Sequence, residues 1–255
     1  MAQRPRLDFA GFHHIVNRGV AKSNIFNSSK DKEKFLEIVC KACRDYFVYI
    51  HDYCLMDNHY HLLIETTSNN LSLFMRQINS NYAIYFNKKY DRSGHLWQGR
   101  FKSWYITNNN YLYTLFKYIE YNPINANIAK KIGQYPYTLL ATIINKDLKV
   151  IPCANDSKLK KEFLHLKEFL NIDFDKKDFE ELNHFQKEAT DIRINGYKRN
   201  KVKTLKEHFN NIKDINDRNV KIIEALKDGY KQIEIAKFLN LTATAICKIK
   251  KKYNG

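Results

Sequence analysis

Apolar and polar residues alternate with a period of two in three short segments of the N-terminal half of the chain. These segments cover residues 12–19, 48–56 and 59–66, and the pattern predicts a β-strand over each of them. Asp57 and Asn58 separate the last two segments, and both residue types favour turns. The sequence therefore predicts one strand followed later by a tight hairpin.

Longer segments show the helical period instead. A helix is predicted over residues 28–47, which open with serine caps. Another is predicted over residues 108–122, which open with asparagine caps. This helix is expected to end near Asn122, because Pro123 disfavours helix at the residue before it. A third helix is predicted over residues 70–90. Its apolar stripe consists of Leu71, Phe74, Ile78, Tyr82 and Tyr85.

The order of these elements predicts an α+β fold. Alternating aromatic residues around Gly99 predict a further hairpin over residues 93–107, so that strand, helix, strand, strand, helix, hairpin and helix follow one another. Such an order fits an antiparallel sheet whose helices lie mainly on one face. We expect this domain to cover residues 1–145, a helical region rich in charged residues to cover 146–213, and a third unit to cover 214–255. Within the second region, "LKKEFLHLKEFL" has helical periodicity.

Charge narrows the class of partner. Lys and Arg outnumber Asp and Glu by 43 to 27, for a formal net charge of +16, and such an excess attracts polyanions, of which nucleic acid is the commonest in a cytoplasm. An acidic lipid surface is the rival, but no segment joins a basic face to a continuous apolar face. No apolar run approaches a membrane span, and the first residues lack the apolar stretch of a signal peptide. We therefore expect a cytoplasmic protein without a membrane partner.

Five cysteines complete the compositional picture. Cys40 and Cys43 form a CxxC pair inside the predicted first helix, but no second pair follows at zinc-ribbon spacing. We therefore expect reduced, buried thiols.

The stretch "CLMDNHYHLLIE" contains the first candidate chemistry. In a strand His59 and His61 share one face, whereas Tyr60 and Leu62 share the other and can enter the core. Two imidazoles two residues apart can bind one divalent ion, although two polar residues on a solvent-facing sheet give the same pattern.

The predicted helix before Pro123 offers a possible partner for this pair. Tyr118 and Asn122 are four residues apart and therefore lie on the same helical face. A phenol is a weak nucleophile at its usual pKa of about 10, but a cation that polarises a phosphodiester would assist its attack. Spacing alone cannot single out Tyr118, because the chain has 17 tyrosines.

Four linked motifs, "HHIVNRG", "CLMDNHYHLLIE", "GHLWQGRFKS" and "YIEYNP", resemble the single-tyrosine HUH transposases. The resemblance covers roughly residues 8–135, and within the IS200-like group it is greatest to the REP-associated tyrosine transposases. It implies an RRM-like fold in which His59 and His61 bind Mg²⁺ or Mn²⁺, Tyr118 is the nucleophile and Asn122 is the third ligand. The third ligand varies in this family.

The implied activity is cleavage of single-stranded DNA near a hairpin through a 5′-phosphotyrosine, followed by rejoining without ATP. Phosphate contacts are expected from Arg18, Arg76, Arg100 and Lys102, and base stacking from Trp97 and Phe101, although ordinary packing would also explain the aromatic residues. The oligomeric state, monomer or homodimer, stays open.

The last 40 or so residues predict a helix-turn-helix. Residues 232–237 would form its first helix and residues 242–252 its recognition helix, with Asn240 in a turn that favours a left-handed residue. Thr242, Thr244 and Lys248 would face duplex DNA, while a protein-interaction module is the other interpretation. The unit resembles the homeodomain-like and DnaA-like modules of longer members of the transposase group.

Three functions remain in competition at this point. A metal-dependent endonuclease and strand transferase comes first, because all four candidate catalytic residues are present. A DNA-binding regulator built on a transposase scaffold, and a nickase like those that initiate replication, are the alternatives.

Overall fold

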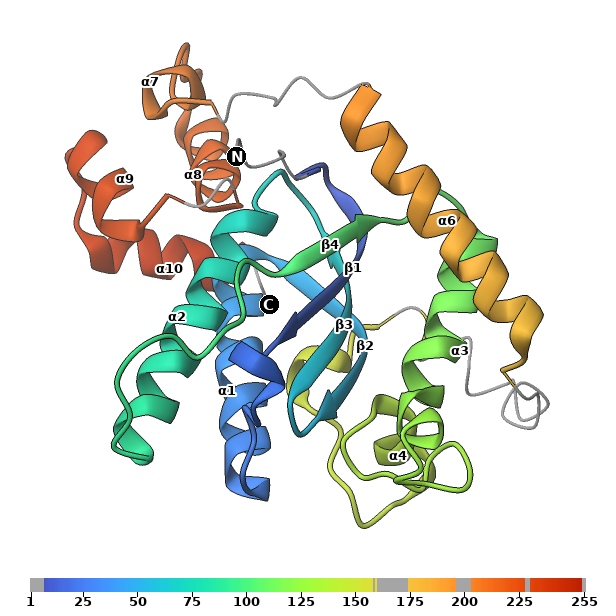
Figure 1. The fold of residues 1–255 in the computed structure, drawn as a ribbon. Coiled ribbons are helices and arrows are strands. Elements are labelled where there is room, and N and C mark those ends of the chain that lie inside the picture. Colours follow the sequence, from blue (N-terminus) through green and yellow to red (C-terminus); the bar gives the residue numbers. More distant parts are fainter. Residues whose placement is uncertain (1–6, 158, 160–173, 196–202, 228–229, 254–255) are drawn as a thin grey trace.

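A four-stranded antiparallel sheet lies at the centre of the N-terminal half of the protein (Figure 1). Its strands are β1 (Gly11–Arg18), β2 (Val48–Met56), β3 (His59–Thr66) and β4 (Lys102–Tyr105), arranged in the order β2-β3-β1-β4. The computed structural model describes residues 7–157, 159, 174–195, 203–227 and 230–253. The predicted hairpin is confirmed, with Asp57 and Asn58 joining β2 to β3.

Two long helices cover one face of the sheet. α1 (Ser29–Tyr46) follows the short 3₁₀ helix η1 (Val20–Lys22), and α2 (Leu71–Lys89) follows β3. Ile15, Tyr60 and Leu62 are fully buried between the sheet and these helices, as the alternation of the strands predicts. The order of elements, βαββαβ, and the order of strands are those of an RRM-like fold.

The opposite face is covered as well. α3 (Asn109–Asn125), α4 (Leu139–Ile144) and α6 (Lys176–Asn195) pack there, with α6 lying along α3 (Figure 1). The prediction that helices lie mainly on one face is therefore wrong for the whole chain. Its physical reason is that β2 and β3 also bear apolar side chains on the second face, where Cys54 and Leu63 are fully buried against Phe116 of α3.

The segment before β4 also differs from the prediction. Residues 93–107 do not form a hairpin, because Trp97 pairs with Gly19 in an isolated bridge and only residues 102–105 form a strand, which pairs with β1. Long-range backbone hydrogen bonds replace the local ones: the N–H of Gln98 donates to the carbonyl of Arg18 at 3.0 Å.

The helix predicted over residues 108–122 extends beyond its expected end. α3 continues to Asn125 with Pro123 inside its last turn. A proline removes one N–H, and so close to the end of the helix only one intrahelical hydrogen bond is lost. The carbonyl of Pro123 accepts from the N–H groups of Ile128 and Ala129, which closes the helix.

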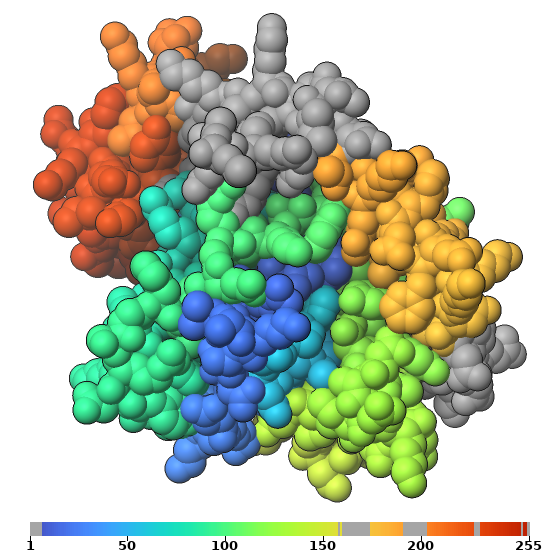
Figure 2. Space-filling view, in the orientation of Figure 1, coloured from blue at the N-terminus to red at the C-terminus, as the bar shows by residue number. Residues whose placement is uncertain are grey.

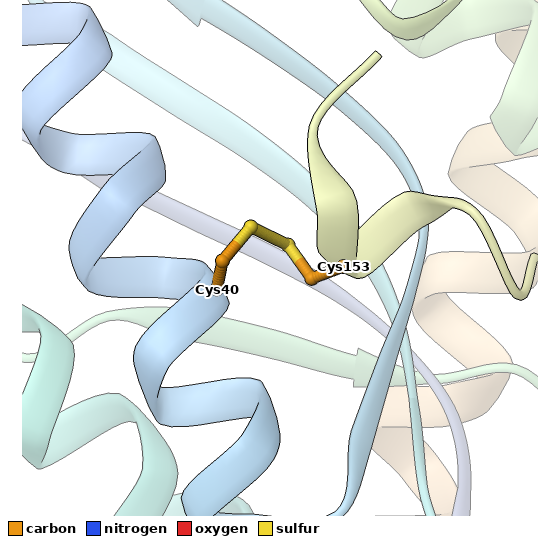
Figure 3. Close-up of a disulfide and its surroundings, with 2 residues drawn as sticks. All are labelled: Cys40 and Cys153. Atoms are coloured by element: carbon orange, nitrogen blue, oxygen red, sulfur yellow. A yellow bond between two sulfur atoms is a disulfide. The ribbon is translucent and has the colours of Figure 1, made fainter. Parts of the chain in front are cut away.

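A disulfide joins Cys40 of α1 to Cys153 of the 3₁₀ helix η2 (Pro152–Ala154), as Figure 3 shows. The Cα atoms of the two cysteines are 5.0 Å apart, within the usual range. The prediction of reduced thiols is therefore wrong for this pair, because the fold brings together two residues that are 113 positions apart. Cys43, the other member of the CxxC pair, is a buried free thiol.

The described residues of the C-terminal unit, 203–227 and 230–253, form α7 (Leu205–His208), α8 (Ile215–Lys227), α9 (Gln232–Phe238) and α10 (Ala243–Tyr253). The last two confirm the predicted helix pair, and Asn240 between them has the expected positive φ of 54°. Ile235, Ala236 and Ile246 form their small core. The helix predicted within "LKKEFLHLKEFL" lies almost wholly outside the described residues. Within the described part of the chain, no helix has the length and hydropathy needed to span a bilayer.

Candidate active site

The two histidines of β3 lie on the second face of the sheet, under α3. His61 is 4% exposed and His59 is half-buried, and their ring centroids are 5.1 Å apart. Across the sheet, Val16 of β1 pairs with His61 and Arg18 pairs with His59. Directly opposed residues of antiparallel strands face the same side, so Arg18 lies beside the histidine pair.

Each histidine is oriented by a neighbouring side chain through its Nδ1 atom. His14 Nε2 lies 3.0 Å from His61 Nδ1, and Asn58 Oδ1 lies 2.6 Å from His59 Nδ1. In both rings Nε2 is left for another ligand, since no described residue forms a hydrogen bond with it. Orientation of a ligating imidazole through its second nitrogen is typical of metal sites.

Both histidines are held in the neutral form that binds metals. Burial lowers the pKa of His61 well below its usual value, and the nearby His14 and His59 lower it further. Burial also lowers the pKa of His59, and the positive charge of Arg18 adds to the effect. Because a metal competes with protons for these nitrogens, a low pKa favours binding near neutral pH.

α3 places Tyr118 against His61 and His14. The ring centroid of Tyr118 is 5.6 Å from that of His61 and 6.3 Å from that of His14. The helix begins with the side chain of Asn108, which accepts a hydrogen bond from the N–H of Tyr111 at 2.8 Å. Burial raises the pKa of the Tyr118 phenol, and a hydrogen bond with the Asn122 side chain partly opposes this rise. The phenol is therefore protonated at neutral pH.

Asn122 follows Tyr118 by one helical turn. Its Nδ2 donates to the backbone carbonyl of Tyr118 at 2.7 Å, which leaves the amide oxygen as a possible ligand. Among the described residues, no three His, Cys, Asp or Glu side chains are grouped as a metal site. A cation here would thus be bound by His59 and His61, with an amide oxygen such as that of Asn122 and solvent completing the set. Two imidazole nitrogens combined with oxygen donors suit a transition-metal ion such as Mn²⁺ better than Mg²⁺, which prefers oxygen ligands alone.

A buried pair of carboxyl groups fixes α3 against the sheet. Asp52 of β2 and Glu120 of α3 interact through a side-chain hydrogen bond, and Glu120 also accepts from the N–H of Leu140 at 2.8 Å. Burial raises the pKa of Glu120 to about 7 and that of Asp52 well above its usual value, the second helped by repulsion from Glu120. The pair therefore retains a proton at neutral pH, and this proton allows two acids to share one site.

Part of the C-terminal half covers the tyrosine. The rings of Phe174 and Phe179 lie 5.7 and 6.1 Å from that of Tyr118. Lys117, the residue before Tyr118, forms a largely buried ion pair with Asp178 of α6 at 2.6 Å. α6 is thus packed against the helix that holds the candidate nucleophile.

Three of the predicted phosphate-binding residues lie together beside His59. Arg18, Arg100 and Lys102 line a cavity of about 620 Å³ that His59 also borders. All three side chains are exposed. The structure thus brings three basic side chains to the edge of the candidate metal site.

The other predicted DNA contacts of this domain lie elsewhere. Trp97 donates from Nε1 to the carbonyl of Asn79 at 3.0 Å and packs against Tyr60 and Tyr82 on the face covered by α1 and α2. Arg76 is exposed on α2, and Phe101 is buried at 7% exposure. In the C-terminal unit Thr242, Thr244 and Lys248 are exposed, as predicted.

Sequence reasoning missed the residues that orient the histidines. The signal for His14 was its place in β1, where every second residue faces the same side as His61 once the two strands pair. For Asn58 the signal was its position next to His59 in the turn. The cover formed by Phe174 and Phe179 had no signal, because it depends on a contact between segments about sixty residues apart.

The domain is of the α+β class: an antiparallel sheet carries two histidines on β3, and α3 packs Tyr118 against that face. Comparison with protein families finds a match to the model described as "Transposase IS200 like" over residues 10–122. This range runs from the start of β1 to Asn122 and so includes the whole candidate site. Over this range the chain is similar to the IS200-like transposase family.

A solved structure described as a REP-associated tyrosine transposase bound to a REP hairpin is 19% identical to the chain, with a TM-score of 0.48. The alignment covers 61% of this chain and 92% of that one. Comparison with curated proteins finds no significant match.

Proposed function

We propose that the protein is a metal-dependent endonuclease and strand transferase that acts on single-stranded DNA near hairpins. The observation that supports this function most directly is the contact between the Tyr118 and His61 rings in one and the same chain. The proposal is supported by a phenol that lies against one of two oriented, neutral imidazoles. A bound Mg²⁺ or Mn²⁺ would polarise the scissile phosphate.

The residues of the chain provide the rest of the reaction. The Tyr118 oxygen attacks phosphorus and loses its proton as the O–P bond forms. The bond between phosphorus and the 3′ oxygen breaks, and that oxygen takes up a proton to give a free 3′-OH. The 5′ phosphate stays linked to Tyr118, so the reverse attack by a 3′-OH rejoins DNA without a further energy source. Arg18, Arg100 and Lys102 would hold the flanking phosphates.

Substitution Tyr118→Phe tests the nucleophile. We expect the variant to form no covalent adduct with a labelled hairpin oligonucleotide in Mg²⁺ or Mn²⁺, whereas the wild-type protein forms one that survives denaturing electrophoresis. Tyr113→Phe makes the same change at an exposed tyrosine of the same helix and is the matched control. Equal adduct yields from the wild type and Tyr118→Phe would refute the assignment.

One observation favours a second function. Phe174 and Phe179 cover the Tyr118 ring, and such cover is compatible with a DNA-binding regulator built on a transposase scaffold. In that case the wild-type protein binds hairpin DNA but forms no adduct with any hairpin tested in either metal.

We also propose that α9 and α10 act as a helix-turn-helix on duplex DNA. Its support is the pair of helices joined at Asn240 and the exposed side chains of Thr242, Thr244 and Lys248 at the start and along the face of α10.

A further inference from the structure

The cavity beside His59 has the chemistry of a nucleotide site. Its volume of about 620 Å³ falls in the range of small-molecule sites, and its lining includes Arg18, Lys22, Arg100 and Lys102 but no acidic residue. Figure 2 shows this side of the molecule, where the segment that contains Gln98, in green, lies against the end of β1 and the residues after it, in blue. The cavity thus extends from His59 along a basic wall that suits a phosphate backbone.

Gln98 is a neutral residue of this wall that two hydrogen bonds with Arg18 hold in place. Its backbone N–H donates to the carbonyl of Arg18 at 3.0 Å, and its side-chain oxygen accepts from Nε of Arg18. A guanidinium group is only a donor, so the atom of Gln98 that faces it must be the oxygen. The amide nitrogen is therefore left with both of its hydrogens, and it donates to no atom of the described residues.

We infer that this cavity binds one base of the single strand next to the scissile phosphate and that Gln98 selects the base through its amide nitrogen. The inference rests on the proposed function for the identity of the strand. A donor at this point favours a base with a keto oxygen, guanine or thymine, over adenine or cytosine, which present an amino group at the equivalent position. Arg18 fixes the direction of the amide, and Lys102 and Arg100 contact phosphates without regard to sequence.

Substitution Gln98→Glu tests the base contact, because a carboxylate can only accept. The experiment measures fluorescence anisotropy of hairpin oligonucleotides whose flanking bases are varied one position at a time. All proteins also contain Tyr118→Phe, so that binding is measured without covalent chemistry. We expect a preference for guanine or thymine at one position, and we expect Gln98→Glu to shift it about tenfold towards adenine or cytosine.

Two further variants keep the test decisive. Gln98→Met removes the donor without adding an acceptor, so it should abolish the preference at that position without reversing it. Lys102 lines the same cavity, and Lys102→Ala should weaken oligonucleotide binding equally for all four bases at the varied position. Circular dichroism and thermal unfolding verify that each variant is folded.

The results separate this inference from the proposed function. If neither Gln98 variant alters the preference at any position while Lys102→Ala weakens binding, the inference is wrong. If the preference changes as expected but wild-type protein never forms an adduct, the base contact stands and the proposed chemistry fails.

Discussion

His14 illustrates how much a single buried imidazole can determine. It is 1% exposed, its ring stacks between those of His61 and Trp104, and burial lowers its pKa to about 3, so it is neutral. When His61 binds a cation through Nε2, its proton must be on Nδ1, where His14 Nε2 lies 3.0 Å away as the acceptor. His14 is therefore a positioning residue that fixes both the ring angle and the tautomer of His61.

Replacing His14 with phenylalanine should weaken metal binding at the proposed His59–His61 site and still fill the space that the His14 ring occupies. The ring stacking is retained but the acceptor is lost, and removal of such an orienting partner typically lowers metal affinity by about 10-fold to 100-fold. Electron paramagnetic resonance titration with Mn²⁺ measures this affinity directly and independently of DNA cleavage. His14→Gln retains an acceptor and should recover part of the affinity. Wild-type Mn²⁺ affinity in a folded His14→Phe protein would contradict the role.

At the scale of elements, local patterns predicted most of the strands and helices. β2, β3, α1 and α2 lie within a residue or so of their expected bounds, because alternation and helical stripes depend only on neighbouring residues. Three features depend on contacts between residues far apart in the sequence, and local patterns therefore do not predict them. They are the pairing of Trp97 with Gly19, the covering of the second face of the sheet, and the disulfide. The same holds for the candidate site. The spacing of His59 and His61 was enough to predict that they share one face of a strand. Tyr118 could be proposed only from the family resemblance, and the position of His14 beside His61 follows only from the register of β1 and β3.

Asp31 joins the two helices of the first face and is the clearest stability determinant among them. Its fully buried carboxylate, at the start of α1, accepts from Lys89 at 2.6 Å and from Tyr90 at 2.7 Å, both at the end of α2. Burial raises the pKa of Asp31, but these hydrogen bonds outweigh it and lower the pKa from 3.8 to about 2. The ionised form is therefore the one that the fold stabilises.

Asp31→Asn should lower the free energy of unfolding by about 2 kcal/mol at pH 7, because the replacement weakens the hydrogen bonds that the fully buried carboxylate accepts from Lys89 and Tyr90. Because the folded pKa lies below the unfolded value, the carboxylate stabilises the fold above pH 4 and loses this effect as the pH falls towards 2. Urea unfolding at pH 7 and pH 3 should show the difference between wild type and variant shrinking at the lower pH. The exposed Asp147→Asn is the control, and a pH-independent difference would exclude the ionised carboxylate as the cause.

At the scale of the whole molecule, the C-terminal unit is attached to the first face of the sheet domain. Lys250 of α10 pairs with Asp45 of α1 at 3.2 Å and lies over the ring of Phe47 at 5.7 Å, and α8 contacts α1. One side of α10 is thus used to hold the unit in place, while Thr244 and Lys248 are exposed. The proposed single-strand site under α3 and the proposed duplex site on α10 would then be held at a fixed distance and orientation within one chain.

Lys248→Ala tests the duplex surface. If Lys248 contacts a phosphate, its removal should weaken binding to duplex DNA of any sequence and reduce the slope of log K against log salt by about 1, because one fewer counterion is released. Lys146→Ala removes an equally exposed charge from the loop after α4 and should leave the slope unchanged. Anisotropy titrations of a labelled duplex between low and physiological salt measure both quantities. A slope that both variants reduce equally would mean that net charge, rather than a site on α10, attracts the duplex. An unchanged slope in Lys248→Ala would favour a protein-interaction module instead.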